Sequence, residues 1–262
     1  MSKSIYMKQI KVENNRLCGS LFHYAHFLCD SLFTEIINEV YNYDEVIRKK
    51  ILGQTIGNFD SIYNEVMQVK NIELPLPEYD NLKIDRIVPN RKECYQERKY
   101  FDKFRDFIFN RYCINPLEYD ETYPEVILIE RSNRVELISD EELKKINNNV
   151  TNGKERREIV DIEKVEEYLQ NKYTTRFKKI MLEHMPFESQ IRYFNNAKII
   201  ISVHGAALAN MMFCKERTTV IQAGRGRWDF FGVIVDILNI DMHYCDENTY
   251  DSFIKKIDEK QI

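Results

Sequence analysis

The segment IIISVHGAALANMMFCKERTTV, residues 199–220, decides the fold, because an apolar run stops at a His-Gly pair and then resumes at helical spacing. Its first five residues are almost all β-branched, which favours a strand buried on both faces of a parallel sheet. The small residues after Gly205 predict a helix over residues 204–213 whose backbone a ligand can approach closely. His204 stands at the expected helix start, where free N–H groups and the helix dipole favour phosphate oxygens.

The composition is that of a soluble globular protein, with 44% hydrophobic and 31% charged residues in a chain of 262. A formal charge of −4 without a basic cluster argues against a nucleic-acid partner. No apolar run approaches the roughly 20 residues that span a bilayer, and the first residues lack the apolar core of a secretory signal. We therefore expect a cytoplasmic protein without a transmembrane segment, whose six widely spaced cysteines are mostly buried and reduced.

From about residue 125 onward, strand-like and helix-like segments alternate, which indicates successive βα units. The expected strands cover residues 126–130, 177–182, 198–203, 219–222 and 241–245. The expected helices cover residues 139–147, 159–172, 187–195, 204–213 and 228–238. The polar stretch between the first two helices, residues 147–158, predicts a surface loop.

The first 120 residues are less regular. Alternating residues predict a strand over 8–13, and apolar stripes predict helices over 24–40 and 91–112. Pro116 and Pro124 bracket a connector, which places a domain boundary near residues 115–124. The expected domains are therefore residues 1–120 and 121–262.

Two interpretations of His204 remain open. It can be a core histidine whose ring is satisfied by a backbone carbonyl. It can also contact a ligand, because ligands of open α/β sheets bind outside the carboxyl ends of the strands, where His204 is expected.

A pair of arginines, Arg131 and Arg134, directly follows the first expected strand and should lie at the same sheet edge as the His-Gly pair. Guanidinium groups are permanently charged and have a fork geometry that suits a diphosphate. The alternative is a pair of solvated arginines that form surface ion pairs with Glu130 or Glu136. Arg225, in the segment GRGRW after a later strand, is a weaker case of the same kind.

A third set of polar residues lies in LFHYAHFLCDSLF, residues 21–33. His26 and Asp30 are four residues apart and so share one face of a helix, where an imidazole and a carboxylate can share a proton as a general base. His23, His26 and Cys29 step by three, but three ligands on one short helix cannot easily converge on zinc. The chain also lacks dinucleotide, P-loop and Asp-x-Asp motifs, so we expect no cofactor and no metal.

Four segments occur in an order that resembles one known family. HGAALAN, residues 204–210, is similar to the family motif H-G-A-G-L-x-N, and ERSNR, residues 130–134, contains its R-x-x-R pattern. HFLCDSL, residues 26–32, matches its H-x-x-x-D-x-L segment, and PFESQIRYFNNAKIIIS, residues 186–202, matches its segment in which a Gln, here Gln190, precedes the motif strand. The family is glycosyltransferase family 61, which includes plant xylosyl- and arabinosyltransferases and animal O-linked GlcNAc transferases.

The resemblance implies an α/β fold of the GT-B type, with two Rossmann-like halves of mainly parallel sheets, the N-terminal half being reduced. The N-terminal domain would bind the acceptor, and the C-terminal domain would bind a nucleotide-sugar donor, expected to carry UDP. It further implies inverting, metal-independent transfer of a hexose or pentose to a glycan, a glycoprotein or another hydroxyl acceptor. Two departures, Ala207 for a motif glycine and Gln222 for a glutamate, leave a non-catalytic nucleotide-sugar-binding or glycan-binding module as an alternative.

The family roles carry over to matching positions of this chain. The residues that would hold the donor diphosphate are Arg131, Arg134, His204, Gly205 and Ala206. Asp30, with His26 as its partner, would take the proton of the acceptor hydroxyl, while Asn210 would support the motif helix and Arg225 the donor site.

Overall fold

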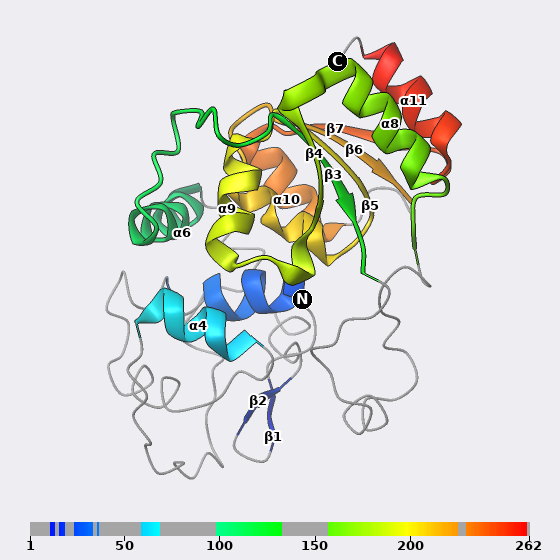
Figure 1. The fold of residues 1–262 in the computed structure, drawn as a ribbon. Coiled ribbons are helices and arrows are strands. Elements are labelled where there is room, and N and C mark those ends of the chain that lie inside the picture. Colours follow the sequence, from blue (N-terminus) through cyan, green and yellow to red (C-terminus); the bar gives the residue numbers. More distant parts are fainter. Residues whose placement is uncertain are drawn as a thin grey trace. The chain divides into compact units, whose positions relative to one another are not determined.

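The structure is a computed structural model that describes residues 11–13, 16–18, 24–33, 36, 59–68, 98–132, 157–224 and 229–260. The chain forms two compact units, Met1–Ile114 and Asn115–Ile262 (Figure 1). Within the described ranges, no helix is both long and apolar enough to cross a membrane.

The second unit is built on a five-stranded sheet in the order β4-β3-β5-β6-β7, in which every neighbouring pair is parallel. Its strands are β3 (Val126–Glu130), β4 (Phe177–Met181), β5 (Ile199–Val203), β6 (Thr219–Ala223) and β7 (Asp241–Cys245). All residues of the central strand β5 are buried, as the apolar run predicts. The predicted α/β fold with a parallel sheet is thus confirmed. Because the strands start in register, their carboxyl ends meet at one edge.

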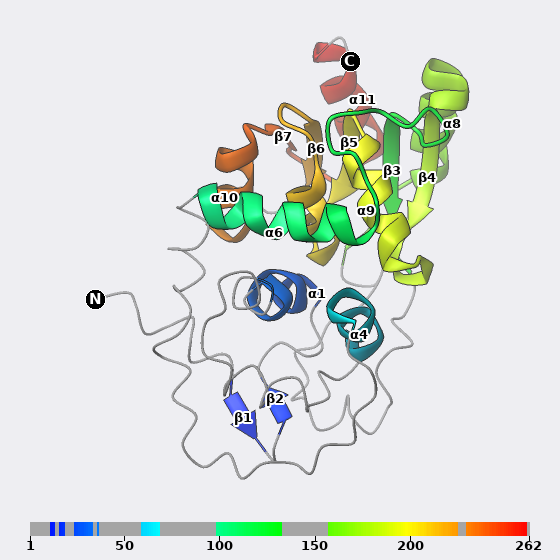
Figure 2. The ribbon, with the colours of Figure 1, turned by 90° about the vertical axis from the view of Figure 1, so that its left-hand side faces the viewer.

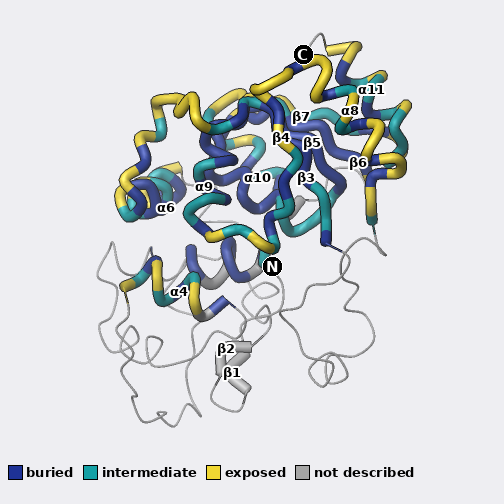
Figure 3. The backbone as a smooth tube through the Cα atoms, viewed as in Figure 1, coloured by how far each residue is buried: buried dark blue, intermediate teal, exposed yellow. Residues whose placement is uncertain are grey.

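Helices cover both faces of this sheet (Figures 1 and 2). On one face, α8 (Ile162–Tyr173) and α11 (Tyr250–Glu259) bury apolar residues in a common core with the strands. On the other lie α9 (Phe187–Asn196) and α10 (Asp229–Leu238), both in contact with the short helix η7 (Ala206–Phe213). Two 3-10 turns, η5 (Thr174–Arg176) and η6 (Leu182–His184), flank β4. Figure 3 shows the inner strands β3, β5 and β6 mostly buried, the edge strands β4 and β7 only partly buried, and parts of α8 and α11 exposed.

The segment after β5 differs from the expected α-helix. His204 and Gly205 precede the helix, with Gly205 fully extended at φ −180° and ψ 177°. The helix itself, η7, is a 3-10 helix over its whole length. Residues 208–213 are all buried, so tertiary packing rather than intrinsic helix preference decides the helix type.

The described part of the first unit holds an antiparallel strand pair and several helices. The pair is β1 (Lys11–Glu13) with β2 (Arg16–Cys18), and the helices include α4 (Asp60–Met67) and α6 (Arg98–Arg111). The expected helix over 24–40 begins as α1 (Tyr24–His26) and continues as a π-helix, η2 (Phe27–Leu32). The Rossmann-like character of this half and the GT-B arrangement stay predictions.

Candidate functional site

The His-Gly turn lies at the carboxyl edge of the sheet, and hydrogen bonds fix its backbone. The His204 N–H donates to the Ala223 carbonyl at 2.8 Å, which extends the β5–β6 pairing by one residue. The His204 carbonyl accepts from Nη1 of Arg157 at 2.9 Å. The Gly205 carbonyl accepts from the Leu208 N–H at 3.1 Å and starts the 3-10 helix.

Arg131, the first residue after β3, lies beside this turn. A Cβ atom built on Gly205 would lie 3.9 Å from both Cζ and Nη1 of Arg131, so the guanidinium flanks the glycine. Strands β3 and β5 are neighbours in the sheet, which brings their ends together. A small cavity of about 20 Å³ adjoins Arg131, between β3 and the segment before α8. The structure thus brings Arg131, His204 and Gly205 together, with Ala206 opening η7 next to them.

The His204 ring is half-buried, and its Nδ1 atom is inaccessible to solvent. Its centroid lies 5.7 Å from that of Phe231 in α10. Gly224, just after β6, passes close to it: a Cβ on Gly224 would lie 3.7 Å from the His204 Cβ, and the backbone there has φ +90°. The imidazole is therefore partly buried, while the His204 backbone forms the turn at the sheet edge; both interpretations of His204 stay predictions.

Asn210 ties the motif helix to α9. Its Nδ2 donates to Oε1 of Gln190 at 3.3 Å, and both side chains are buried. Nε2 of Gln190 in turn donates to the carbonyls of Leu182 and Met185, each at 3.2 Å. Two residues from separate matching segments thus form one buried network that holds η7 against α9.

Charged groups near the end of β3 are paired across the sheet. Nζ of Lys179 lies 2.5 Å from Glu166 and 3.5 Å from Glu130. Burial is the largest single effect on the pKa of Lys179 and lowers it. The two carboxylates together outweigh burial and raise this pKa overall. Glu130, which the sequence offers as a partner of Arg131, thus pairs with Lys179.

Several predicted site residues cannot be placed. Arg134 and Arg225 lie outside the described residues. The backbones of His26 and Asp30 lie in α1 and η2, but their side chains are outside the described part of the structure. The roles assigned to these four residues stay predictions. Among the described residues, no three His, Cys, Asp or Glu side chains are grouped as metal ligands would be.

Sequence reasoning missed Arg157, which lies at the end of the stretch expected to be a surface loop. Its bond to His204 joins residues 47 positions apart. The only local sequence signal was the pair Arg156-Arg157 directly before an apolar helix.

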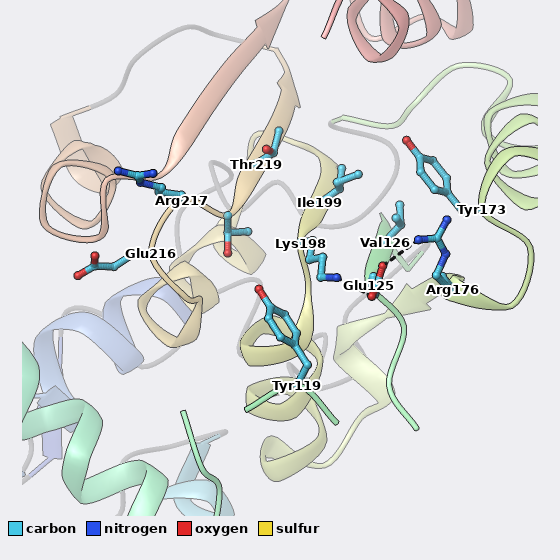
Figure 4. Close-up of a pocket in the computed structure, with 11 residues that line it drawn as sticks. Tyr119, Glu125, Val126, Tyr173, Arg176, Lys198, Ile199, Glu216, Arg217 and Thr219 are labelled. Atoms are coloured by element: carbon cyan, nitrogen blue, oxygen red, sulfur yellow. Dashed lines mark hydrogen bonds and ion pairs between the residues drawn. The ribbon is translucent and has the colours of Figure 1, made fainter. Parts of the chain in front are cut away.

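A larger cavity, of about 500 Å³, lies at the opposite, amino edge of the same sheet (Figure 4). Glu125 binds both Lys198, at 2.6 Å, and Arg176, at 3.3 Å, in its wall. Strands of five residues rise by about 3.3 Å per residue, so this cavity is roughly 16 Å from the His-Gly turn. Ligands of open α/β sheets bind at the carboxyl edge, so the turn, and not this larger cavity, is the candidate active site.

The sequence profile of the family described as Glycosyltransferase 61 matches residues 24–221. The match runs from α1 to β6 and so contains the His-Gly turn, Arg131 and the Gln190–Asn210 network. A comparison with curated proteins gave no match. Since the family profile covers well over half of the chain, the chain belongs to glycosyltransferase family 61.

Proposed function

We propose that the protein transfers a sugar from a nucleotide donor to a hydroxyl acceptor, with inversion and without a metal ion. The observation that carries this proposal is the approach of the Arg131 guanidinium to the His204–Gly205 turn at the carboxyl edge of the parallel sheet. A permanent cation and backbone N–H groups at this place suit the diphosphate of a nucleotide sugar.

The reaction is a direct displacement at the anomeric carbon. The acceptor oxygen forms a bond to this carbon while the bond from the carbon to the diphosphate oxygen breaks. The electron pair leaves with the diphosphate, whose growing charge Arg131, Arg134 and His204 stabilise. Asp30, supported by His26, takes the proton of the acceptor hydroxyl. Attack from the face opposite the leaving group inverts the configuration.

The donor in this proposal is a UDP-sugar carrying a hexose or a pentose such as xylose. The acceptor is a glycan or glycoprotein hydroxyl, and the reaction takes place in the cytoplasm. Side chains and backbone N–H groups neutralise the diphosphate in place of a divalent cation, so activity is expected to survive a chelator.

The test is incubation of the full chain with a panel of UDP-sugars and oligosaccharide acceptors in EDTA. Mass spectrometry would detect the transferred sugar, and NMR would give the anomeric configuration of the product. Arg131→Ala is expected to lose transfer, whereas Arg176→Ala, at the other edge of the sheet, is expected to keep it. A folded wild-type chain that neither binds nor turns over any nucleotide sugar would refute the proposal.

A second candidate, a binding module without turnover, is favoured by Gln222. This residue is 2% exposed in β6, at the position where family members usually carry a glutamate. Asp30→Asn separates the two candidates. A catalyst should lose turnover and keep donor affinity, whereas a binding module shows no turnover in either form.

A further inference from the structure

Arg157 contacts the motif turn from outside the four motif segments, within the range that the family profile matches. Nη1 of Arg157 donates to the His204 carbonyl at 2.9 Å. The segment that carries Arg157 is itself held in place: the Val160 N–H donates to the Asn248 carbonyl at 2.8 Å, and Asn248 Nδ2 donates to the Glu158 carbonyl at 2.5 Å. Ile159 adds a buried apolar anchor. The position of the guanidinium is therefore set by the fold of the second unit.

The His204 carbonyl is the acceptor that a longer 3-10 helix would use. In a 3-10 helix, each N–H donates to the carbonyl three residues earlier, so the Ala207 N–H would donate to His204. In the structure, the first such bond instead runs from the Leu208 N–H to Gly205. Gly205 is extended, so the bond from Ala207 does not form, and the His204 carbonyl accepts from Arg157 instead.

This arrangement leaves backbone N–H groups at the turn that can donate to a ligand. Within the described part of the chain, no acceptor is found for the N–H groups of Gly205, Ala206 and Ala207. All three residues are half-exposed, so a ligand can reach them. The partial negative charge of the His204 carbonyl oxygen would repel an anion, but this oxygen accepts a hydrogen bond from the cationic Arg157.

We propose that Arg157 is a positioning residue of the donor site: it binds the His204 carbonyl and so keeps the N–H groups of residues 205–207 directed to the donor diphosphate. This inference rests on the proposed function and adds to it a residue from outside the family motifs. Arg157 acts through the backbone of the turn, whereas Arg131 flanks the glycine directly.

The experiment compares the binding of UDP and of uridine to the full chain by calorimetry. Arg157→Ala is expected to bind UDP at least tenfold more weakly and to bind uridine within twofold of wild type, because uridine has no phosphate. Arg157→Lys, which keeps a charged donor, should recover most of the UDP affinity. Arg176→Ala is the matched control, an arginine that pairs with Glu125 at the other edge, and should leave both affinities within twofold.

The outcomes separate this inference from the proposed function. If wild type binds UDP and Arg157→Ala binds it equally well, the positioning role is wrong and the proposed function stands. An equal loss of UDP and uridine affinity would also overturn it, because that result indicates general disturbance of the site. If wild type binds no nucleoside diphosphate, both fail. If Arg157→Ala does not fold, Arg157→Met, which keeps the aliphatic stem, is measured against Arg157→Lys in its place.

Discussion

The buried pair of Gln190 and Asn210 allows a quantitative test of how the motif helix is held. Gln190→Ala removes three hydrogen bonds: the one that Oε1 accepts from Asn210, and the two that Nε2 donates to the carbonyls of Leu182 and Met185. The Leu182 carbonyl is buried and keeps the bond from the Met185 N–H at 3.0 Å, and the buried Asn210 amide loses its bond to Oε1. Met185 is partly exposed, so water can replace its bond.

The magnitude follows from the hydrogen bonds that are lost. Each contributes about 0.5–1.5 kcal/mol net, so the loss of three gives roughly 1.5–4.5 kcal/mol for Gln190→Ala. Asn210→Ala leaves only Oε1 of Gln190 without this donor and is expected to cost about 1–3 kcal/mol. Because both variants lose the same bond, the double variant should be less destabilised than the sum, by about 1 kcal/mol.

The assay is chemical denaturation of the four forms of this cycle, with thermal unfolding as a second probe. A domain of this size loses about 2–4 °C in Tm per kcal/mol, so Gln190→Ala should melt roughly 3–18 °C lower. Gln170→Ala is the matched control: its Nε2 donates to the Thr174 carbonyl at 2.8 Å at an exposed site, and the change should stay within about 0.5 kcal/mol. Strict additivity in the cycle, or a Gln190 variant as stable as the Gln170 variant, would refute the reasoning.

Three further predictions concern single sites of the second unit. Gly224→Ala should lower the free energy of unfolding by about 1–2 kcal/mol, because φ is +90° at this residue. Gly205→Ala, where φ is −180°, should melt within 2 °C of wild type and weaken only UDP binding. The hydrogen bond from Lys198 lowers the pKa of Glu125, so their pair stabilises the fold fully above the ordinary carboxyl pKa, and this stabilisation is lost as the pH falls through the lowered pKa of Glu125. Lys198→Met should flatten the decline of Tm between pH 5 and 3, and an unchanged slope would contradict the assignment. Burial raises the pKa of Cys245 to about 11, so its thiol should resist iodoacetamide at pH 8 until the chain unfolds, and peptide mapping would reveal any earlier labelling.

The sheet could be predicted because its strands are apolar runs bounded by polar residues. The predicted bounds of β3 and β7 match the structure, and the other three strands differ by one residue at one end. The start of α8 was less accurate: Asp161, with φ 56°, interrupts the backbone, although Ile159 is buried in phase with the helix. The apolar pattern of a sequence reports which residues are buried, and Ile159 is buried although it lies outside the helix. The pattern therefore predicts a helix start that is too early.

Only part of the candidate site follows from local sequence. Arg131 could be placed because a residue that ends a strand next to β5 must lie near the end of β5. The 3-10 form of η7 could not be predicted, since it results from burial against α9 and α10, which are distant in sequence. The contact of Arg157 with His204 likewise depends on the anchoring of its segment by Asn248, 90 residues beyond Glu158.

Because η7 is a 3-10 helix and not the predicted α-helix, the main source of positive charge at the turn also differs from the prediction. A helix dipole is equivalent to about half a charge at its N-terminus, and η7 is a short helix of eight residues with the poorer hydrogen-bond geometry of the 3-10 form. Arg131 and Arg157 each bring a full charge: Arg157 binds the His204 carbonyl, and the Arg131 guanidinium lies beside Gly205. In the proposed site, we therefore expect the electrostatic part of donor binding to come mainly from these arginines, one at the end of β3 and one in the segment before α8, and the small residues of the motif to give the diphosphate access to the backbone.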